Sequence, residues 1–286
     1  MKHLAGYLAL ILMLCGCQTD RQTAPNTLFV SIAPLKGLVE AITEQDFPIE
    51  VLVPVGASPE TFEPTPRQYI ALNEACWIFN TGLIDFEQSL LSKIEAREKL
   101  INLSNGITLL GGSCSHAHGH AHGAAHHHGV DPHIWTSPRV LQQMAATIYA
   151  TIHAAYPDSV RYTTNYERLH ERLQALDKRT EQRIADSGIR SFVVYHPALT
   201  YYARDYGLTQ EAVEQEGKEP SARQLAALIR KAQAEGVRTI LYQRQFSRSS
   251  VTTLANDIGA EAVEFDPLAT DILAQIDSIT TLITKR

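Results

Sequence analysis

The sequence lacks an excess of positive charge and, at its N-terminus, an apolar run long enough to stay in a membrane. Its 25 Lys and Arg against 31 Asp and Glu give a net charge of −6, which argues against nucleic acid or an anionic lipid surface as a partner. The apolar run of residues 4–14 is too short to cross a bilayer permanently. With 44% hydrophobic and 20% charged residues, the chain is not wholly disordered, and its 286 residues suffice for about two domains.

Cysteine is scarce, and two of the four cysteines lie at the N-terminus. Lys2, the short apolar run and the small residues after it are typical of a secretory signal. Leu14-Cys15-Gly16-Cys17 resembles a bacterial lipoprotein box, which implies removal of residues 1–16 and a lipid on the Cys17 thiol. The alternative is an ordinary signal peptide with two incidental cysteines. We therefore expect an exported protein, attached by its lipid to the extracytoplasmic, most simply periplasmic, face of a bacterial membrane through a polar tether at 17–26.

Two cysteines remain in the rest of the chain, Cys76 and Cys114, and an oxidising compartment permits a disulfide between them. Cys76 lies in the strand-like sequence Ala75-Cys76-Trp77-Ile78-Phe79, which favours a small core residue. Cys114 adjoins a run of histidines, where it is either a free thiol or an additional metal donor.

Histidine is the abundant and unevenly placed residue type. Seven of the twelve histidines fall within thirteen residues, inside a segment at 113–129 made only of Gly, Ser, Cys, His and Ala. This composition predicts a flexible low-complexity loop that binds metal weakly at several positions. The seven histidines are His116, His118, His120, His122, His126, His127 and His128.

Short β-rich runs alternate with helical patterns on both sides of one long amphipathic helix. The alternation indicates βαβ units, and so an α/β fold with a mostly parallel sheet flanked by helices in each of two lobes. We expect an N-terminal lobe at 27–157, a connecting helix at 158–187 and a C-terminal lobe at 188–286. A coiled-coil dimer through the long helix is the alternative, but its apolar stripe covers too few heptads, and we expect a monomer.

Four possible ligand side chains follow predicted strands or turns, where open α/β sheets place their binding sites. Each also has an ordinary explanation: a polar residue at a strand end, a turn-starting Asp before Pro, or an acid in the first turn of a helix. They are Glu60, His133, His196 and Asp266.

Several segments, in the same order, resemble the zinc/manganese family of solute-binding proteins that serve bacterial ABC importers. They are VPVGASPETFEPTP (53–66), DPHIWTSP (131–138), YHPALTYYA (195–203), GKEPS (217–221) and FDPL (265–268). The resemblance covers the chain from about Asn26 and implies two α/β lobes joined by one long helix.

The resemblance implies that Glu60, His133, His196 and Asp266 are the metal ligands. The family pattern has His where this chain has Glu60, and Glu at this position favours harder ions such as Mn²⁺ more than three histidines would. Direct ligation by Glu60 is favoured over a position near the metal, with water or a loop histidine completing the shell. His196 is typical of the zinc branch, since the manganese branch has Glu there, and the histidine-rich loop also favours Zn²⁺.

The function implied is a receptor that captures Zn²⁺, or alternatively Mn²⁺, between the lobes and delivers it to an ABC permease and its ATPase, with no catalysis. A secreted zinc hydrolase, with Glu60 as the general base, is a second hypothesis. The absence of a His-Glu-x-x-His string or a recognisable nucleophile motif argues against it. A metal buffer or an adhesin without a permease is the third.

Overall fold

Two separate four-stranded parallel sheets organise the chain in a computed structural model that describes residues 26–112, 129–214 and 218–285. The first sheet has the strand order β2-β1-β3-β4 and the second the order β6-β5-β7-β8. In both, the chain passes through a helix or a loop before it returns to a parallel neighbour, which is the βαβ connection expected from the sequence. The expected α/β architecture with two lobes is confirmed.

The first lobe contains short strands whose ends are fixed by helix starts and turns. Thr65 and Gln68 form a capping box at the start of the second helix, so the loop before it is held firmly. The strands are β1 (Leu28–Val30), β2 (Ile49–Val51), β3 (Trp77–Asn80) and β4 (Leu100–Asn102). The helices are α1 (Ala33–Thr43), α2 (Pro66–Glu74) and α3 (Asp85–Leu91), with 3₁₀ turns η1 (Arg97–Lys99) and η2 (Ile134–Thr136).

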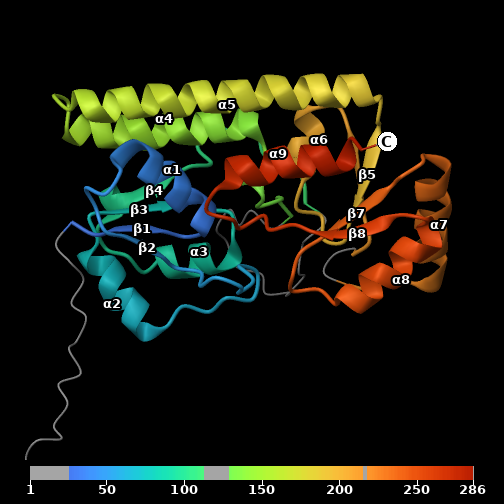
Figure 1. The fold of residues 1–286 in the computed structure, drawn as a ribbon. Coiled ribbons are helices and arrows are strands. Elements are labelled where there is room, and N and C mark those ends of the chain that lie inside the picture. Colours follow the sequence, from blue (N-terminus) through green and yellow to red (C-terminus); the bar gives the residue numbers. More distant parts are fainter. Residues whose placement is uncertain (1–25, 113–128, 215–217, 286) are drawn as a thin grey trace, which may run out of the picture.

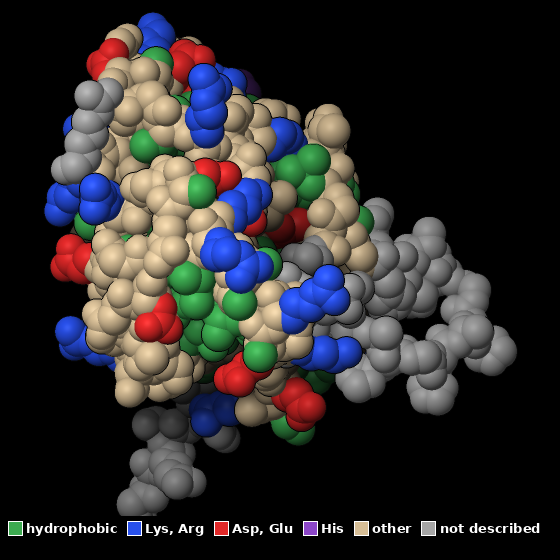
Figure 2. All heavy atoms as spheres, turned by 90° about the vertical axis from the view of Figure 1, so that its right-hand side faces the viewer, with side chains coloured by type: hydrophobic (Ala, Val, Ile, Leu, Met, Phe, Trp, Pro, Cys, Tyr) green, Lys and Arg blue, Asp and Glu red, His purple; other side chains and the backbone are tan. Residues whose placement is uncertain are grey.

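The second lobe repeats the pattern after the long helix. A capping box between Ser221 and Gln224 starts one of its helices. The strands are β5 (Ser191–Val194), β6 (Thr209–Ala212), β7 (Thr239–Tyr242) and β8 (Glu261–Glu264). The helices are α6 (Thr200–Asp205), α7 (Ala222–Ala234), α8 (Arg248–Ile258) and α9 (Ile272–Ile283). Basic and acidic side chains are interspersed over the face of this lobe drawn in Figure 2.

One long helix, α5 (Val160–Ser187), runs along both lobes beside α4 (Pro138–Ala155) (Figure 1). Its 28 residues span ~42 Å at 1.5 Å each. It packs against α1 of the first lobe and α9 of the second through one buried stripe that includes Leu169, Leu176 and Ile184. The helix ends where Gly188 adopts the left-handed conformation, with φ of 67°. The long connecting helix expected from the sequence is therefore present.

The lobes also contact each other directly beside the cleft. Trp135 Nε1 donates a hydrogen bond of 2.8 Å to the Pro267 carbonyl, which joins η2 to the loop after β8. Gly37 of α1 lies so close to the Thr270 carbonyl that a Cβ atom at Gly37 would be 2.0 Å from its oxygen. These two contacts hold the ends of both sheets near each other, where the metal ligands were expected.

Several details differ from the sequence-based expectations. Ser137 stands at the N-cap of α4, where a serine typically caps the helix, but its hydroxyl donates to Asp205 instead. Cys76 immediately precedes β3 and is half-buried against the core, not a fully buried core residue. No helix of the described ranges is long and apolar enough to span a membrane. The signal, Cys17 and its tether up to residue 25, Cys114 and the seven clustered histidines lie outside the described residues, so their roles stay predictions, as do the lobe boundaries.

Candidate metal centre

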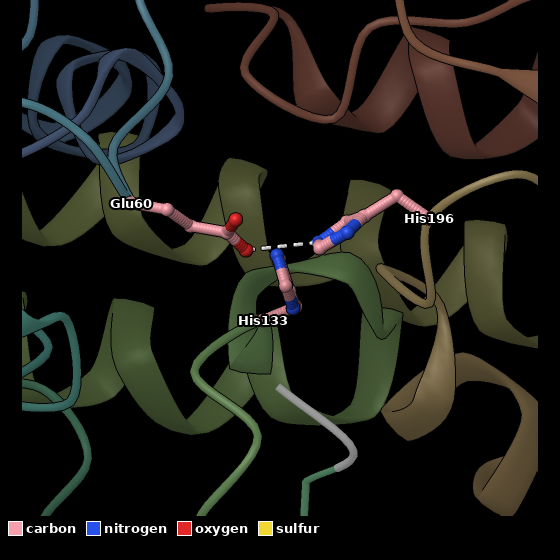
Figure 3. Close-up of side chains that lie close together, drawn as sticks. All are labelled: Glu60, His133 and His196. Atoms are coloured by element: carbon pink, nitrogen blue, oxygen red, sulfur yellow. Dashed lines mark ion pairs between the residues drawn. The ribbon is translucent and has the colours of Figure 1, made fainter. Parts of the chain in front are cut away.

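Three of the four predicted ligands come together in the cleft between the lobes. Glu60, His133 and His196 each offer one ligand atom, and these atoms all lie within 4.8 Å of one another. Figure 3 shows Glu60 and His196 approaching from opposite sides, with a ring nitrogen of His133 turned toward both. The group joins residues separated by more than a hundred positions of sequence, so only the tertiary fold creates it.

Glu60 reaches the cleft from the loop between β2 and α2. Gly56 in this loop has φ of 85°, a conformation that glycine adopts without strain, and so the chain turns sharply after Pro54. The backbone N–H of Glu60 donates to Ser58 Oγ at 3.3 Å, which fixes the local direction of the loop. The carboxylate then lies with Oε1 3.0 Å from His196 Nε2.

His133 is held by a buried carboxylate two residues before it. Asp131 Oδ1 accepts the backbone N–H of His133 at 2.8 Å and lies 2.9 Å from its Nδ1. Burial alone would raise the pKa of Asp131, but the charge and hydrogen bonds of His133 outweigh it and lower that pKa. Because Nδ1 is engaged with an ionised carboxylate, Nε2 is the nitrogen available to a metal.

His196 lies two residues after the end of β5 and between two carboxylates. Its Nδ1 is 3.1 Å from Glu214 Oε2, and its Nε2 faces Glu60. Burial would lower the pKa of His196, but the hydrogen bonds with Glu214 and Glu60 outweigh it and raise the pKa to about 9. With this raised pKa, His196 is protonated at neutral pH and bridges the two acids, and a cation that bound its Nε2 would have to displace that proton.

Glu60, His133 and His196 line a cavity of about 290 Å³ between the lobes. The first lobe contributes Trp135 and the loop around Glu60, and the second contributes Phe246, whose ring stacks on His196 with centroids 6.0 Å apart. Its apolar walls lower the local dielectric around the polar groups and so strengthen their electrostatic interactions. A cavity of this kind can bind a small desolvated cation.

Asp266, the fourth predicted ligand, does not join this group in the structure. It follows β8 and accepts the backbone N–H of Leu268 at 2.9 Å. It lines a smaller neighbouring cavity of about 110 Å³, which shares Leu268 and Gln245 with the larger one. Its role as a ligand stays a prediction.

Three residues at the site were not identified from the sequence. Asp131 is part of the family motif DPHIWTSP but was not predicted as a site residue, although a carboxylate hydrogen-bonded to a metal-binding His is a typical supporting group. Glu214 carried no signal, since it follows the unrecognised strand β6. Gln243 follows β7 and lines the same cavity.

The family model for the periplasmic zinc-uptake complex component A, ZnuA, matches residues 28–284. The chain belongs to the ZnuA family. Among curated relatives, the zinc-binding lipoprotein AdcA of Streptococcus pneumoniae is 28% identical over 292 residues, covering 99% of this chain. This chain spans only 56% of that relative's length. The high-affinity zinc uptake system protein ZnuA of Bacillus subtilis is 29% identical over 266 residues, covering 88% of this chain and 83% of the relative.

Solved structures agree with the ZnuA assignment. A crystal structure of ZnuA is similar with a TM-score of 0.78 and 34% identity, covering 90% of this chain and 97% of the other. A manganese-bound solute-binding protein from Pseudomonas aeruginosa has a TM-score of 0.72 at 21% identity, which shows a shared fold alone. The resemblance to the zinc/manganese solute-binding family, made from motifs, is confirmed.

Proposed function

We propose that this protein is an extracytoplasmic receptor that binds Zn²⁺ in the cavity between the lobes and delivers it to an ABC permease. The observation that carries this proposal is the convergence of Glu60, His133 and His196, with ligand atoms within 4.8 Å of one another. One carboxylate and two imidazoles form a donor set that suits Zn²⁺. Asp266 is proposed as a further ligand. For this, the loop after β8 would have to move so that the Asp266 carboxylate reaches the ion.

The choice of Zn²⁺ over Mn²⁺ rests on the two imidazoles and on the relatives. Manganese prefers oxygen donors, whereas His133 and His196 supply nitrogen. The relatives from S. pneumoniae and B. subtilis are named for zinc binding and zinc uptake. We propose that the histidines of the loop at 113–129 collect further zinc weakly, outside the main site.

Capture and release are proposed to depend on the division of ligands between the lobes. Glu60 and His133 belong to the first lobe and His196 to the second, so a small relative movement changes the distances between donors. A bound ion would hold the lobes together, and a partner that separates them would lower its affinity. This arrangement fits a permease with its ATPase as the partner. Cys17 is proposed as the site of the lipid anchor.

A non-enzymatic role is also part of the proposal. A hydrolytic zinc site needs a general base held off the metal, beside its bound water. Glu60, the residue suggested for that base, instead lies with His196 in the ligand group itself. This geometry supports binding over catalysis.

Zinc accumulation in cells tests the proposal. A strain lacking the gene should take up less ⁶⁵Zn at limiting zinc, and the full chain should restore uptake. A His196→Ala chain, expressed at the same level, should not restore it. Full restoration by that variant, or uptake of ⁵⁴Mn but not ⁶⁵Zn, would contradict the proposed function.

A further inference from the structure

The carboxyl edge of the second sheet carries one polar side chain after each of its four strands. In the spatial order β6-β5-β7-β8, these residues are Glu214, His196, Gln243 and Asp266. Gln243 thus follows the strand between those of His196 and Asp266. This edge is where parallel sheets place their binding sites, so Gln243 stands where a ligand-binding residue is expected.

Gln243 is buried with one end of its amide satisfied and the other not. The residue is 1% exposed, and its Nε2 lies 3.4 Å from the backbone oxygen of His196, to which it donates. No residue of the described ranges donates a hydrogen bond to its Oε1, which is also buried. A buried amide oxygen without a donor is costly, and this side chain lines the cavity that holds Glu60, His133 and His196.

We infer that Gln243 Oε1 accepts a hydrogen bond from water on the captured ion, and so helps to set the affinity of the site. This inference rests on the proposed function. With Glu60, His133 and His196 as ligands, a tetrahedral ion has one position left, which water fills as long as Asp266 stays outside the ligand group, as it does in the structure. That water is a strong donor in a largely apolar cavity and needs an acceptor, and Gln243 Oε1 is an acceptor that lacks a donor.

The amide also suits a site that binds without catalysing. A neutral side-chain carbonyl accepts a hydrogen bond but takes no proton, so it orients the water without acting as a general base. It adds no negative charge, in contrast to the neighbouring Asp266. Gln243 is therefore a positioning residue, which acts on the ion through its water.

Zinc competition against a chromophoric chelator tests this role in the full chain and two variants of Gln243. Gln243→Leu removes the acceptor and should lower the zinc affinity roughly 10- to 100-fold, the usual effect of losing an outer-shell partner. Gln243→Glu keeps an acceptor but loses the donor to His196, and it should return the affinity to the parent level or above. Gln143→Leu is the control, since Gln143 is an exposed amide on α4 that does not line the cavity, and this variant should bind zinc as the parent does.

The outcomes separate this inference from the proposed function. A parent chain that does not bind zinc overturns both. If the parent binds and Gln243→Leu binds equally well, the proposed function stands and the role of Gln243 is wrong. If both Gln243 variants are equally weak, Gln243 only supports the backbone at His196, and the inference also fails. The visible absorption of Co²⁺-loaded protein gives a second readout, because Gln243→Leu should change the ligand-field bands while Gln143→Leu should not.

Discussion

His196 Nε2 lies 3.0 Å from Glu60 Oε1, although the two residues belong to different lobes. The pair lies in the cleft beside His133, whose ring nitrogen is close to both side chains. Glu214 Oε2 contacts the other ring nitrogen of His196, Nδ1. In the absence of an ion, this contact is a charged hydrogen bond across the cleft. In the proposed function, the same two atoms become ligands of the ion, so that a proton and Zn²⁺ compete for His196 Nε2.

Replacement of Glu60 tests whether this carboxylate is a ligand. Glu60→Ala should lower the zinc affinity roughly 100-fold or more, because loss of a ligand should cost at least as much as loss of an outer-shell partner. Glu63→Ala is the matched control, because Glu63 is an exposed acid in the same loop and should bind zinc as the parent does. Competitive titration of the two variants measures the difference. Equal affinity in Glu60→Ala and the parent would exclude direct ligation.

The raised pKa of His196 predicts tighter zinc binding at higher pH. Its pKa of about 9 exceeds the ordinary value of about 6.5. Since only the neutral imidazole binds zinc, the affinity should rise between about pH 6.5 and pH 9. Titrations at several pH values measure this, and Glu214→Gln should shift the rise to lower pH. A flat profile in the parent would contradict the account.

Protonation of His196, which opposes zinc binding, stabilises the folded protein when no metal is bound. A group whose pKa is raised on folding stabilises the folded state below its unfolded pKa, and this contribution is lost as the pH rises through its folded pKa. The free energy of unfolding without metal should therefore contain a contribution from His196 that is full below about pH 6.5 and gone above about pH 9. Urea unfolding in a chelator measures it, with His196→Gln as the comparison.

The close approach of α1 to the loop before α9 predicts an unusual effect of alanine at Gly37. In an ordinary helix, Gly→Ala is stabilising by about 1 kcal/mol. Here the new Cβ would meet the Thr270 carbonyl oxygen at 2.0 Å, so we expect a loss of about 1–3 kcal/mol and weaker zinc binding as the lobes are pushed apart. Gly111→Ala is the control, since its Cβ would lie 3.8 Å from its nearest neighbour. Thermal unfolding would contradict the account if Gly37→Ala were the more stable variant.

The histidine-rich loop is predicted to be separable from the main site. Its two ends adjoin each other, with the N–H of Gly112 2.6 Å from the carbonyl oxygen of Gly129, so residues 113–128 can be replaced by a short link. The shortened chain should keep one tightly bound zinc and lose the weaker additional ions. Metal analysis after dialysis against graded chelator counts both classes. Loss of the tight site would show that the loop contributes to it.

The sequence allowed prediction of the elements with strong periodicity or clear caps. The long helix at 160–187 was expected almost to its ends, because Ser159 caps its start and Gly188 ends it. Strand β6 was missed, since its sequence Thr-Gln-Glu-Ala is polar and it lies at the edge of its sheet. The residues of the site likewise divide into those predicted from the sequence and those found only in the structure. Glu60, His133 and His196 carried family motifs, whereas Glu214 and Gln243 become part of the site only through the order of strands in the second sheet.

The central claim is tested most directly by diffraction from zinc-loaded crystals at wavelengths on either side of the zinc edge. The account predicts one strong anomalous peak in the cleft, with Glu60 oxygen and the Nε2 atoms of His133 and His196 at about 2.0–2.2 Å. A peak that lies away from these three atoms, or zinc held only by the loop at 113–129, would contradict it.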